Sequence, residues 1–200
     1  MVLGWGMCSR VLIILANPDS NPVHLGHDLA QAYKDGAEQA GREVRVLKLA
    51  ELDVPYLRGA HEWKKPLPKQ LHGARDDLLW AEHLVIVTPL WMGDMPALLK
   101  AFLEQILRPG IAFDGNTKPK LNSGLLCGRS ARVIMTMGMP AWFYHVFYGA
   151  PAMTLLRRQI LKFVGYRPVR GTCIGMVDSM SKERYVRLMN RMRRMGRRGV

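Results

Sequence analysis

The sequence predicts a doubly wound α/β domain built on a mostly parallel sheet, and three observations support this. Short apolar runs alternate with stretches of helical periodicity along the 200-residue chain. The apolar runs are strand-sized, and the helical stretches lie between them, as in repeated β-α-β units. With 48% hydrophobic residues, the chain can bury one sizeable core, and its length argues against two full domains. We therefore expect a single domain over residues 10–200, preceded by a flexible segment at 1–9.

Five runs are predicted to be strands. They are residues 11–15, 43–49, 84–88, 131–137 and 169–177. The first and third, VLIIL and LVIVT, are continuously apolar, which is typical of strands buried on both faces of a parallel sheet. Pro168 stands just before the fifth run and places the start of that strand at a sheet edge, because proline cannot donate a ladder hydrogen bond.

Helices are predicted between the strands. The first should begin near Pro22 with Asn21 as its cap, because proline is favoured at the first helical position. Its inward stripe is Leu25, Leu29, Ala32, Tyr33 and Ala37. Further helices are expected at about 71–82 and 97–107, and a later one carries Met153, Leu156, Ile160 and Phe163 inward. Residues 53–70 are predicted to be irregular, with three prolines as breakers.

Five strands with intervening helices fit the flavodoxin-like order 2-1-3-4-5, with right-handed crossovers and helices on both faces. In such sheets, ligands bind beyond the carboxyl ends of the strands, at the switch in strand order. Three loops should therefore converge on one site: residues 17–24, 89–96 and 138–148. Residues 108–130 form a long connection rich in Gly, Pro, Asn and Lys, and connections of that length are often functional or lie at an interface.

The first loop, NPDSNPVH, carries neither a dinucleotide-binding glycine fingerprint nor a P-loop. It can still bind phosphate through a helix N-terminus, with free backbone N–H groups and the positive end of the helix dipole. Asn17, Ser20, Asn21 and His24 would add side-chain hydrogen bonds. The other interpretation is simply a capped helix.

The second loop, PLWMGDMP, follows a predicted strand and leads directly into a helix. Trp91 lies beside Gly93 at the ligand-binding end of the sheet, where an indole can flank a planar ring. A tryptophan that packs in the core is the alternative interpretation.

The string PLWMGDMPALLK resembles the NAD(P)H:quinone oxidoreductase branch of the flavodoxin-like superfamily, whose loop reads P-L-aromatic-aromatic-x-x-M-P-A-hydrophobic-L-K. The matching positions are Pro89, Leu90, Trp91, Met95, Pro96, Ala97, Leu99 and Lys100. Met92 replaces the second aromatic residue. The segments LIILANPDSN, GIAF, RVIMTMGMP and KFVGYRPVRGT also match the family, in its order along the chain.

This resemblance implies a flavoprotein that takes electrons from NAD(P)H and reduces quinones or similar planar acceptors. The implied cofactor contacts in the second and third loops are Pro89, Leu90, Trp91, Met92, Gly93, Thr136, Gly138 and Met139. Tyr144 and His145 are the counterparts of the family's proton-handling pair, with a different spacing. The opening motif also departs at Asn17-Pro18 and Pro22, so FMN and FAD both stay open. A homodimer is implied, with helix 97–107 and the 142–148 aromatics as interface elements.

The net charge of +13 and pI of about 10.1 favour anionic partners, and much of the charge lies in the last segment. There, arginines and apolar residues alternate at helical spacing: Arg184, Arg187, Arg191, Arg194 and Arg198 against Tyr185, Leu188, Met192 and Met195. This predicts an amphipathic helix packed on the domain with a solvated basic face. The same face would dock a partner if the protein were instead an ancillary subunit of a membrane transport system, such as a potassium efflux system.

Two further functions are less well supported. Single-electron carriers of this fold are usually acidic, whereas this chain is basic. Nucleic-acid binding rests on charge alone and is not expected.

Three cysteines and six histidines form no metal-ligand spacing, so we expect no metal and reduced thiols. Without a signal peptide or a 20-residue apolar stretch, the chain is expected to be cytoplasmic, with peripheral membrane contact at most.

Overall fold

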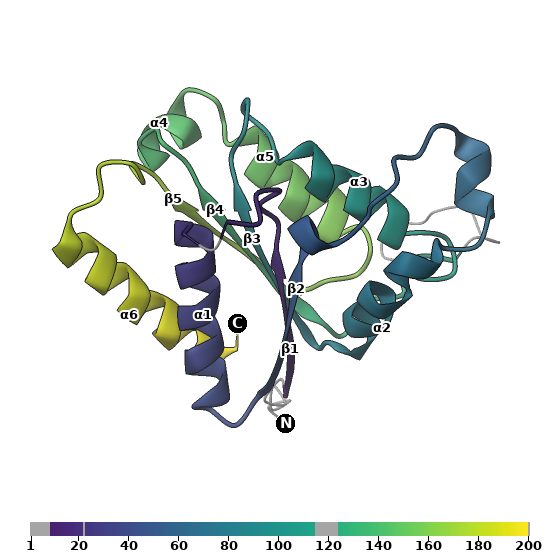
Figure 1. Ribbon diagram of the computed structural model, residues 1–200, viewed down its shortest axis with the longest axis horizontal. Helices are drawn as coiled ribbons and strands as arrows, with labels where there is room; N and C mark the ends of the chain where they lie inside the picture. Colours follow the sequence, from purple (N-terminus) through teal and green to yellow (C-terminus); the bar gives the residue numbers. More distant parts are fainter. Residues whose placement is uncertain (1–8, 22, 115–123, 200) are drawn as a thin grey trace, which may run out of the picture.

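The computed structural model describes residues 9–21, 23–114 and 124–199, and its centre is a five-stranded sheet (Figure 1). The strands are β1 (Arg10–Leu15), β2 (Glu43–Lys48), β3 (His83–Pro89), β4 (Ser130–Thr136) and β5 (Val169–Ile174). Their order is β2-β1-β3-β4-β5, and all four neighbouring pairs are parallel. This confirms the predicted order 2-1-3-4-5, and β5 lies at an edge, as Pro168 indicated.

Helices cover both faces of the sheet (Figure 1). On one face lie α1 (Leu25–Glu38) and α6 (Lys182–Arg198). On the other face lie α2 (His72–Trp80), α3 (Ala97–Ile106) and α5 (Pro151–Thr154), which continues as a π-helix at Leu155–Leu161. The short α4 (Ala141–Val146) lies beyond the carboxyl end of β4.

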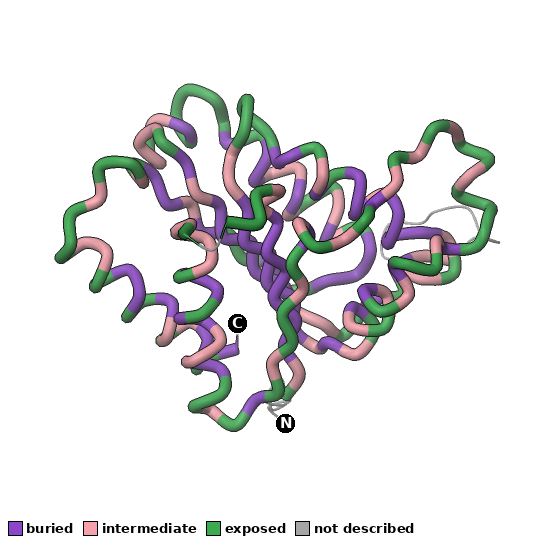
Figure 2. Tube along the Cα trace, in the orientation of Figure 1, coloured by how far each residue is buried: buried purple, intermediate pink, exposed green. Residues whose placement is uncertain are grey.

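Alternate residues of β1 supply the two halves of the core. Val11 and Ile13 pack with the α1 and α6 side, and Leu12 and Ile14 pack with the opposite side. All four side chains are buried, and Figure 2 shows the buried trace running through the centre of the sheet. The period of two along a strand turns one apolar run into contacts on both faces.

The segment between β2 and α2 is irregular, as predicted, and contains three short 3₁₀ helices at Leu49–Glu51, Ala60–Lys64 and Lys69–Leu71. Arg108, at the end of α3, anchors it. The buried guanidinium donates hydrogen bonds to the carbonyl oxygens of Lys65, at 2.8 Å, and of Gln105, at 2.9 Å. These hydrogen bonds fix the position of the irregular segment relative to α3.

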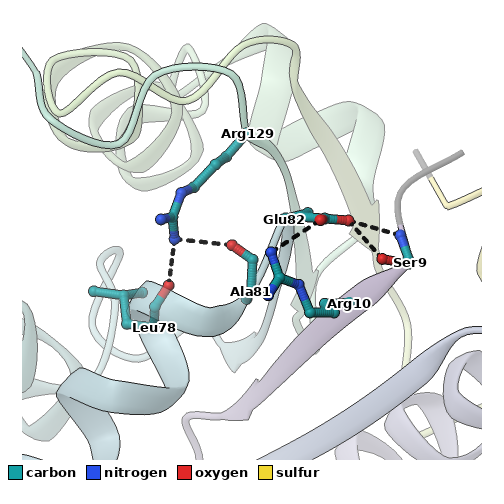
Figure 3. Close-up of polar contacts among 6 residues, drawn as sticks. All are labelled: Ser9, Arg10, Leu78, Ala81, Glu82 and Arg129. Atoms are coloured by element: carbon teal, nitrogen blue, oxygen red, sulfur yellow. Dashed lines mark hydrogen bonds and ion pairs between the residues drawn. The ribbon is translucent and has the colours of Figure 1, made fainter. Parts of the chain in front are cut away.

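At the amino edge of the sheet, side-chain hydrogen bonds link neighbouring segments of the chain (Figure 3). Glu82 accepts hydrogen bonds from the backbone N–H of Ser9, at 2.7 Å, and from the Arg10 guanidinium, at 3.0 Å. Arg129 donates to the carbonyl oxygens of Leu78 and Ala81, which are at the end of α2. Ser9 is thus bonded to the domain, although residues 1–9 were predicted to be flexible. Residues 1–8 lie outside the described part.

Two of the helices differ from the prediction at the carboxyl edge. The helix α1 begins at Leu25 with His24 as the N-cap residue, not near Pro22, which lies outside the described residues. Asn21 does not cap it, because its Oδ1 accepts a hydrogen bond from the N–H of Val23 in a local turn. A loop was expected over 138–148, yet α4 forms there, and the rings of Phe143 and Phe147, four residues apart, stack at 4.4 Å.

Two details near β5 correct the sequence-based prediction. Phe163 was expected to point inward but is 40% exposed, because the π-helical stretch before it has a wider turn that rotates later residues off the predicted face. The strand β5 ends at Ile174 rather than at residue 177. Met176 has a positive φ of 53°, which extended backbone cannot accommodate.

The predicted basic, amphipathic helix is α6, which packs along α1 and buries Leu188 and Met192. The two helices approach at Gly36 and Gly196. A Cβ atom placed on Gly196 would lie 2.0 Å from the carbonyl oxygen of Tyr33, and one on Gly36 would lie 2.0 Å from that of Arg193. The contact is therefore backbone against backbone, and neither position has room for a side chain.

None of the helices in the described part of the chain is long and apolar enough to cross a membrane. In the connection at 108–130, the ends are ordered by isolated bridges between Pro109 and Phe113 and between Phe113 and Gly124. Residues 115–123 of that connection lie outside the described part.

Candidate functional site

A pocket of about 420 Å³ opens at the carboxyl edge of the sheet, next to the ends of β1, β3 and β4. Its volume is in the range of small-molecule and cofactor sites. The lining residues are Leu15, Asn17, Asp19, Val23, His24, Leu25, Gly26, His27, Val87, Thr88, Pro89, Trp91, Thr136, Val177 and Asp178. The wall combines apolar side chains, such as Leu15 and Val87, with polar ones, such as Asn17, Asp19 and Thr136.

The start of α1 forms part of the wall of this pocket. His24 is the N-cap residue and makes no side-chain hydrogen bond to the first turn. Leu25, Gly26 and His27, the first three helical residues, all line the pocket. The N–H of His27 donates to the carbonyl oxygen of His24, at 2.9 Å. The N–H groups at the very start of a helix have no partners within the helix, and they carry the positive end of its dipole. A phosphate group fits this part of the pocket.

The loop before α1 is held by a series of local side-chain hydrogen bonds. Asn17 Oδ1 accepts from the N–H of Asp19, and Asp19 Oδ1 accepts from the N–H of Asn21, at 3.2 and 2.8 Å. Asp19 Oδ2 lies 2.8 Å from Nε2 of His24. The bond from the Asn21 N–H, and then the His24 ring, lower the pKa of the Asp19 carboxyl. The carboxylate therefore stays charged at neutral pH and holds the imidazole in place.

The second loop is a tight two-residue turn. Trp91 and Asp94 exchange both backbone hydrogen bonds, at 2.8 and 2.9 Å. Met92 and Gly93 between them have positive φ angles of 48° and 83°, as in the turns that suit two-residue hairpins. The indole of Trp91 is 48% exposed and lines the pocket, which rules out the interpretation of a core tryptophan. Met92 is fully exposed at the tip of the turn.

A fourth segment, immediately after β5, completes the pocket with Val177 and Asp178. A Cβ atom on Gly138 would lie 3.0 Å from Oδ2 of Asp178, so the third loop packs closely against this segment. Sequence reasoning missed both residues. The signal was available, because β5 ends at the same edge as the other parallel strands, and the residues after it belong with the other three loops.

Five of the predicted site residues line the pocket: Asn17, His24, Pro89, Trp91 and Thr136. The others lie outside it. Ser20 and Asn21 are exposed in the first loop, Leu90 and Met139 pack against the core, Met92 and Gly93 form the turn, and Gly138 packs against Asp178. Asp19, which sequence reasoning passed over within NPDSNPVH, is also in the wall.

The geometry argues against Tyr144 as a proton donor in this pocket. Its side chain is 1% exposed and does not line the pocket, and its hydroxyl accepts a hydrogen bond from the N–H of Ala152 at 3.1 Å. Burial raises the pKa of the phenol. Its packing role was hidden because the sequence did not reveal α4, which turns Tyr144 inward and leaves His145 exposed outside the pocket.

The fold and this pocket can be compared with known proteins. A sequence model of the family described as having a flavodoxin-like fold matches residues 9–195. The chain belongs to this flavodoxin-like family. An FMN-dependent NADH:quinone oxidoreductase 2 of Pseudomonas putida is 30% identical over 177 residues, which cover 80% of this chain and 84% of that protein. A protein of the same name from Pseudomonas fluorescens is 34% identical over 180 residues, with the same coverage of the two chains.

Solved structures of other flavodoxin-like proteins share the fold. Smu.1420 from Streptococcus mutans superposes with a TM-score of 0.80 at 24% identity and covers 94% of this chain and 98% of its own. An FMN-dependent NADH-azoreductase from Bacillus anthracis, solved in complex with FMN, has a TM-score of 0.72 at 16% identity, and covers 94% of this chain and 97% of its own. At these identities, the likeness concerns the fold.

In the described ranges, no group of three or more His, Cys, Asp or Glu side chains could hold a metal ion. The pocket chemistry fits an organic ligand. Its wall combines an uncapped helix start, an exposed indole and apolar side chains at the strand ends.

Proposed function

We propose that this protein is an FMN-dependent NAD(P)H oxidoreductase that reduces quinones or similar planar acceptors in the pocket at the carboxyl edge of its sheet. The observation that carries the proposal is the pairing of the uncapped start of α1 with Trp91 in one cavity of about 420 Å³. The names of the Pseudomonas relatives support FMN, NADH and quinone as the ligands.

In this proposal, the start of α1 holds the FMN phosphate, with the N–H groups of Leu25 and Gly26 as donors. The carboxylates of Asp19 and Asp178 accept hydrogen bonds from ligand hydroxyl groups, because ionised carboxylates accept and do not donate. His24 is held beside Asp19, with its Nε2 at 2.8 Å from Oδ2 of the carboxylate.

FMN, when bound, supplies two-electron hydride chemistry between the nicotinamide donor and the acceptor. The protein residues bind and orient the reactants. Trp91 offers one aromatic face to the ligand, and Pro89 and Val87 add apolar surface that excludes water. Thr136, at the end of β4, places a hydroxyl on the same wall.

Replacing Trp91 by alanine should weaken FMN binding or raise the acceptor KM by roughly tenfold, since an aromatic pair contributes about 1 kcal/mol beyond its buried area and the indole area is lost as well. Flavin fluorescence titration and steady-state quinone reduction measure the two effects. The control is Trp63→Ala, which removes an indole of similar exposure that lines a different cavity. Equal FMN affinities and equal acceptor KM values in the wild type and Trp91→Ala would refute the role of Trp91.

A homodimer is part of the proposal, and the structure changes its expected interface. The apolar face of α3 is used inside the chain, where Leu99, Phe102 and Ile106 are fully buried, so the expectation of a dimer contact there is wrong. The aromatics around α4 are available, because Phe147 and Tyr148 are exposed.

Light scattering of the wild type at micromolar concentration should give the mass of two chains, and Phe147→Asp should give the mass of one, because a buried charge without a partner opposes association. A monomeric wild type would refute the dimer. A dimeric Phe147→Asp variant would move the interface elsewhere.

A further inference from the structure

A second and larger groove, of about 630 Å³, lies between α4, the exit of β5 and α6. Its lining residues are Pro140, Ala141, Trp142, Cys173, Ile174, Gly175, Met176, Arg184, Arg187, Leu188 and Arg191. None of them lines the proposed cofactor pocket. The chain after β5 separates the two cavities, because residues 175–176 face the groove and residues 177–178 face the pocket.

All of the charged side chains that line this groove are positive. Three arginines line it, and no acidic residue does. Arg184, Arg187 and Arg191 are three and four residues apart on α6, so they share one face of the helix and extend over about 10 Å. In the described part of the chain, no carboxylate pairs with Arg187 or Arg191, and such a row of like charges favours an anion.

One of these cations is preorganised by the backbone. The Arg184 guanidinium donates to the carbonyl oxygen of Gly175, at 2.7 Å. A Cβ atom on Gly175 would lie 2.4 Å from the backbone nitrogen of Ala141, so this glycine lets the exit of β5 pack directly against the start of α4. Through the Arg184 hydrogen bond and the close contact with Ala141, the exit of β5 at Gly175 holds both α6 and α4.

The opposite wall is apolar and aromatic. The indole of Trp142 is 64% exposed, and its ring packs edge-on against Phe143 at 5.9 Å. Ile174, at the end of β5, and Leu188, on α6 beside the arginines, add aliphatic surface to the groove. Burial raises the pKa of the Cys173 thiol, so this residue adds no negative charge at neutral pH. An aromatic wall facing a row of arginines suits a flat ring that carries an anionic group.

We propose that this groove is a second binding site for a small molecule that joins a planar apolar ring to a carboxylate, sulfonate or phosphate group. In this arrangement, Arg187 and Arg191 bind the anionic group and Trp142 flanks the ring. The site is separate from the cofactor pocket and does not depend on the function proposed for that pocket.

Isothermal titration calorimetry with 2-naphthoate tests the site directly, and the neutral 2-naphthamide tests the need for charge. The double variant Arg187→Ala/Arg191→Ala and the single variant Trp142→Ala should each bind 2-naphthoate roughly tenfold or more weakly, the loss expected for hydrogen bonds to charged groups and for an aromatic contact. The control Arg194→Ala/Arg198→Ala removes the same charge from α6 outside the groove and should bind as the wild type does.

Several results would overturn the proposal. Equal weakening by both double variants would indicate a net-charge effect, and equal binding of 2-naphthamide would remove the role of the arginines. Loss of 2-naphthoate binding when FMN is saturating would place the probe in the cofactor pocket. No binding of 2-naphthoate, together with binding to phosphatidylglycerol vesicles that depends on Arg187 and Arg191, would make the groove a membrane-docking surface instead. A failure of FMN titration alone would count against the proposed function and leave this site standing.

Discussion

Replacing Gly196 by alanine is expected to destabilise the protein by about 2–3 kcal/mol, although the same change stabilises most helices. The added Cβ atom would lie 2.0 Å from the Tyr33 carbonyl oxygen and 2.9 Å from the backbone nitrogen of Ala37. Backbone atoms of a packed helix cannot move aside as the end of a flexible side chain can. The helices α1 and α6 must therefore separate, which loosens their contact around Leu188 and Met192.

The test is whether each glycine-to-alanine substitution lowers or raises the free energy of unfolding. A Cβ atom added to Gly73 in α2 would meet nothing within 4 Å, so Gly73→Ala should raise the free energy of unfolding by up to about 1 kcal/mol. Urea unfolding followed by circular dichroism measures both variants. If Gly196→Ala were as stable as Gly73→Ala, the close crossing of α1 and α6 would not exist. Gly36→Ala, on the other side of the crossing, should behave as Gly196→Ala does.

The second large effect is a loss of stability in acid, caused by His83 at the start of β3. This side chain is fully buried, with Nε2 at 2.9 Å from the Tyr33 hydroxyl and Nδ1 at 2.7 Å from Ser130 Oγ. Burial, and then the charges of Arg132, Arg42 and Arg170, lower the pKa of the imidazole from 6.5 to about 3. The folded protein therefore keeps this histidine neutral.

The unfolded chain binds a proton at this histidine below about pH 6.5, and the folded protein does so only near pH 3. Between these values, the unfolded state holds more protons, so stability falls as the pH falls. His83 contributes fully above pH 6.5, and the loss grows to the order of 4 kcal/mol as the pH approaches 3.

His83→Gln removes the titration and keeps a side chain that can both donate and accept. We expect it to be less stable than the wild type at pH 7.5, with a shallower decline in the free energy of unfolding between pH 6.5 and 4. Carboxylates with lowered pKa values, such as Glu82, contribute equally to both proteins, so the difference in slope isolates His83. The exposed His61→Gln is the control. Parallel slopes for His83→Gln and the wild type would contradict the assignment.

Much of the fold could be predicted because its determinants are local. Continuous apolar runs such as VLIIL have to be buried on both faces, and strands of that kind separated by helices leave few topologies for a chain of this length. The amphipathic pattern of α6 was readable for the same reason, since its period places Leu188 and Met192 on one face. Trp91 was found from its place in a turn that leads into a helix.

Other features depended on contacts between distant residues. Nothing near Tyr144 in the sequence shows that its hydroxyl accepts a hydrogen bond from the N–H of Ala152. The helix α4, in which the rings of Phe143 and Phe147 stack, forms in a segment whose sequence is typical of a loop. Asp178 reached the pocket because β5 ends at the edge shared by β1, β3 and β4. The grouping of Arg184, Arg187 and Arg191 with Trp142 arises only because α6 and α4 both lie beside the exit of β5.

The sequence by itself determined the strands, their order, the edge at which the pocket opens and the basic face of the last helix, because periodicity and turn chemistry act over a few residues. The tertiary structure alone decided which polar groups share a cavity. Asn17 and His24 face the pocket while Ser20 does not, although all three lie in one loop. That choice depends on how the chain turns between Asp19 and α1 and on which strand ends lie beside it, and neither is encoded by residue type at a fixed spacing.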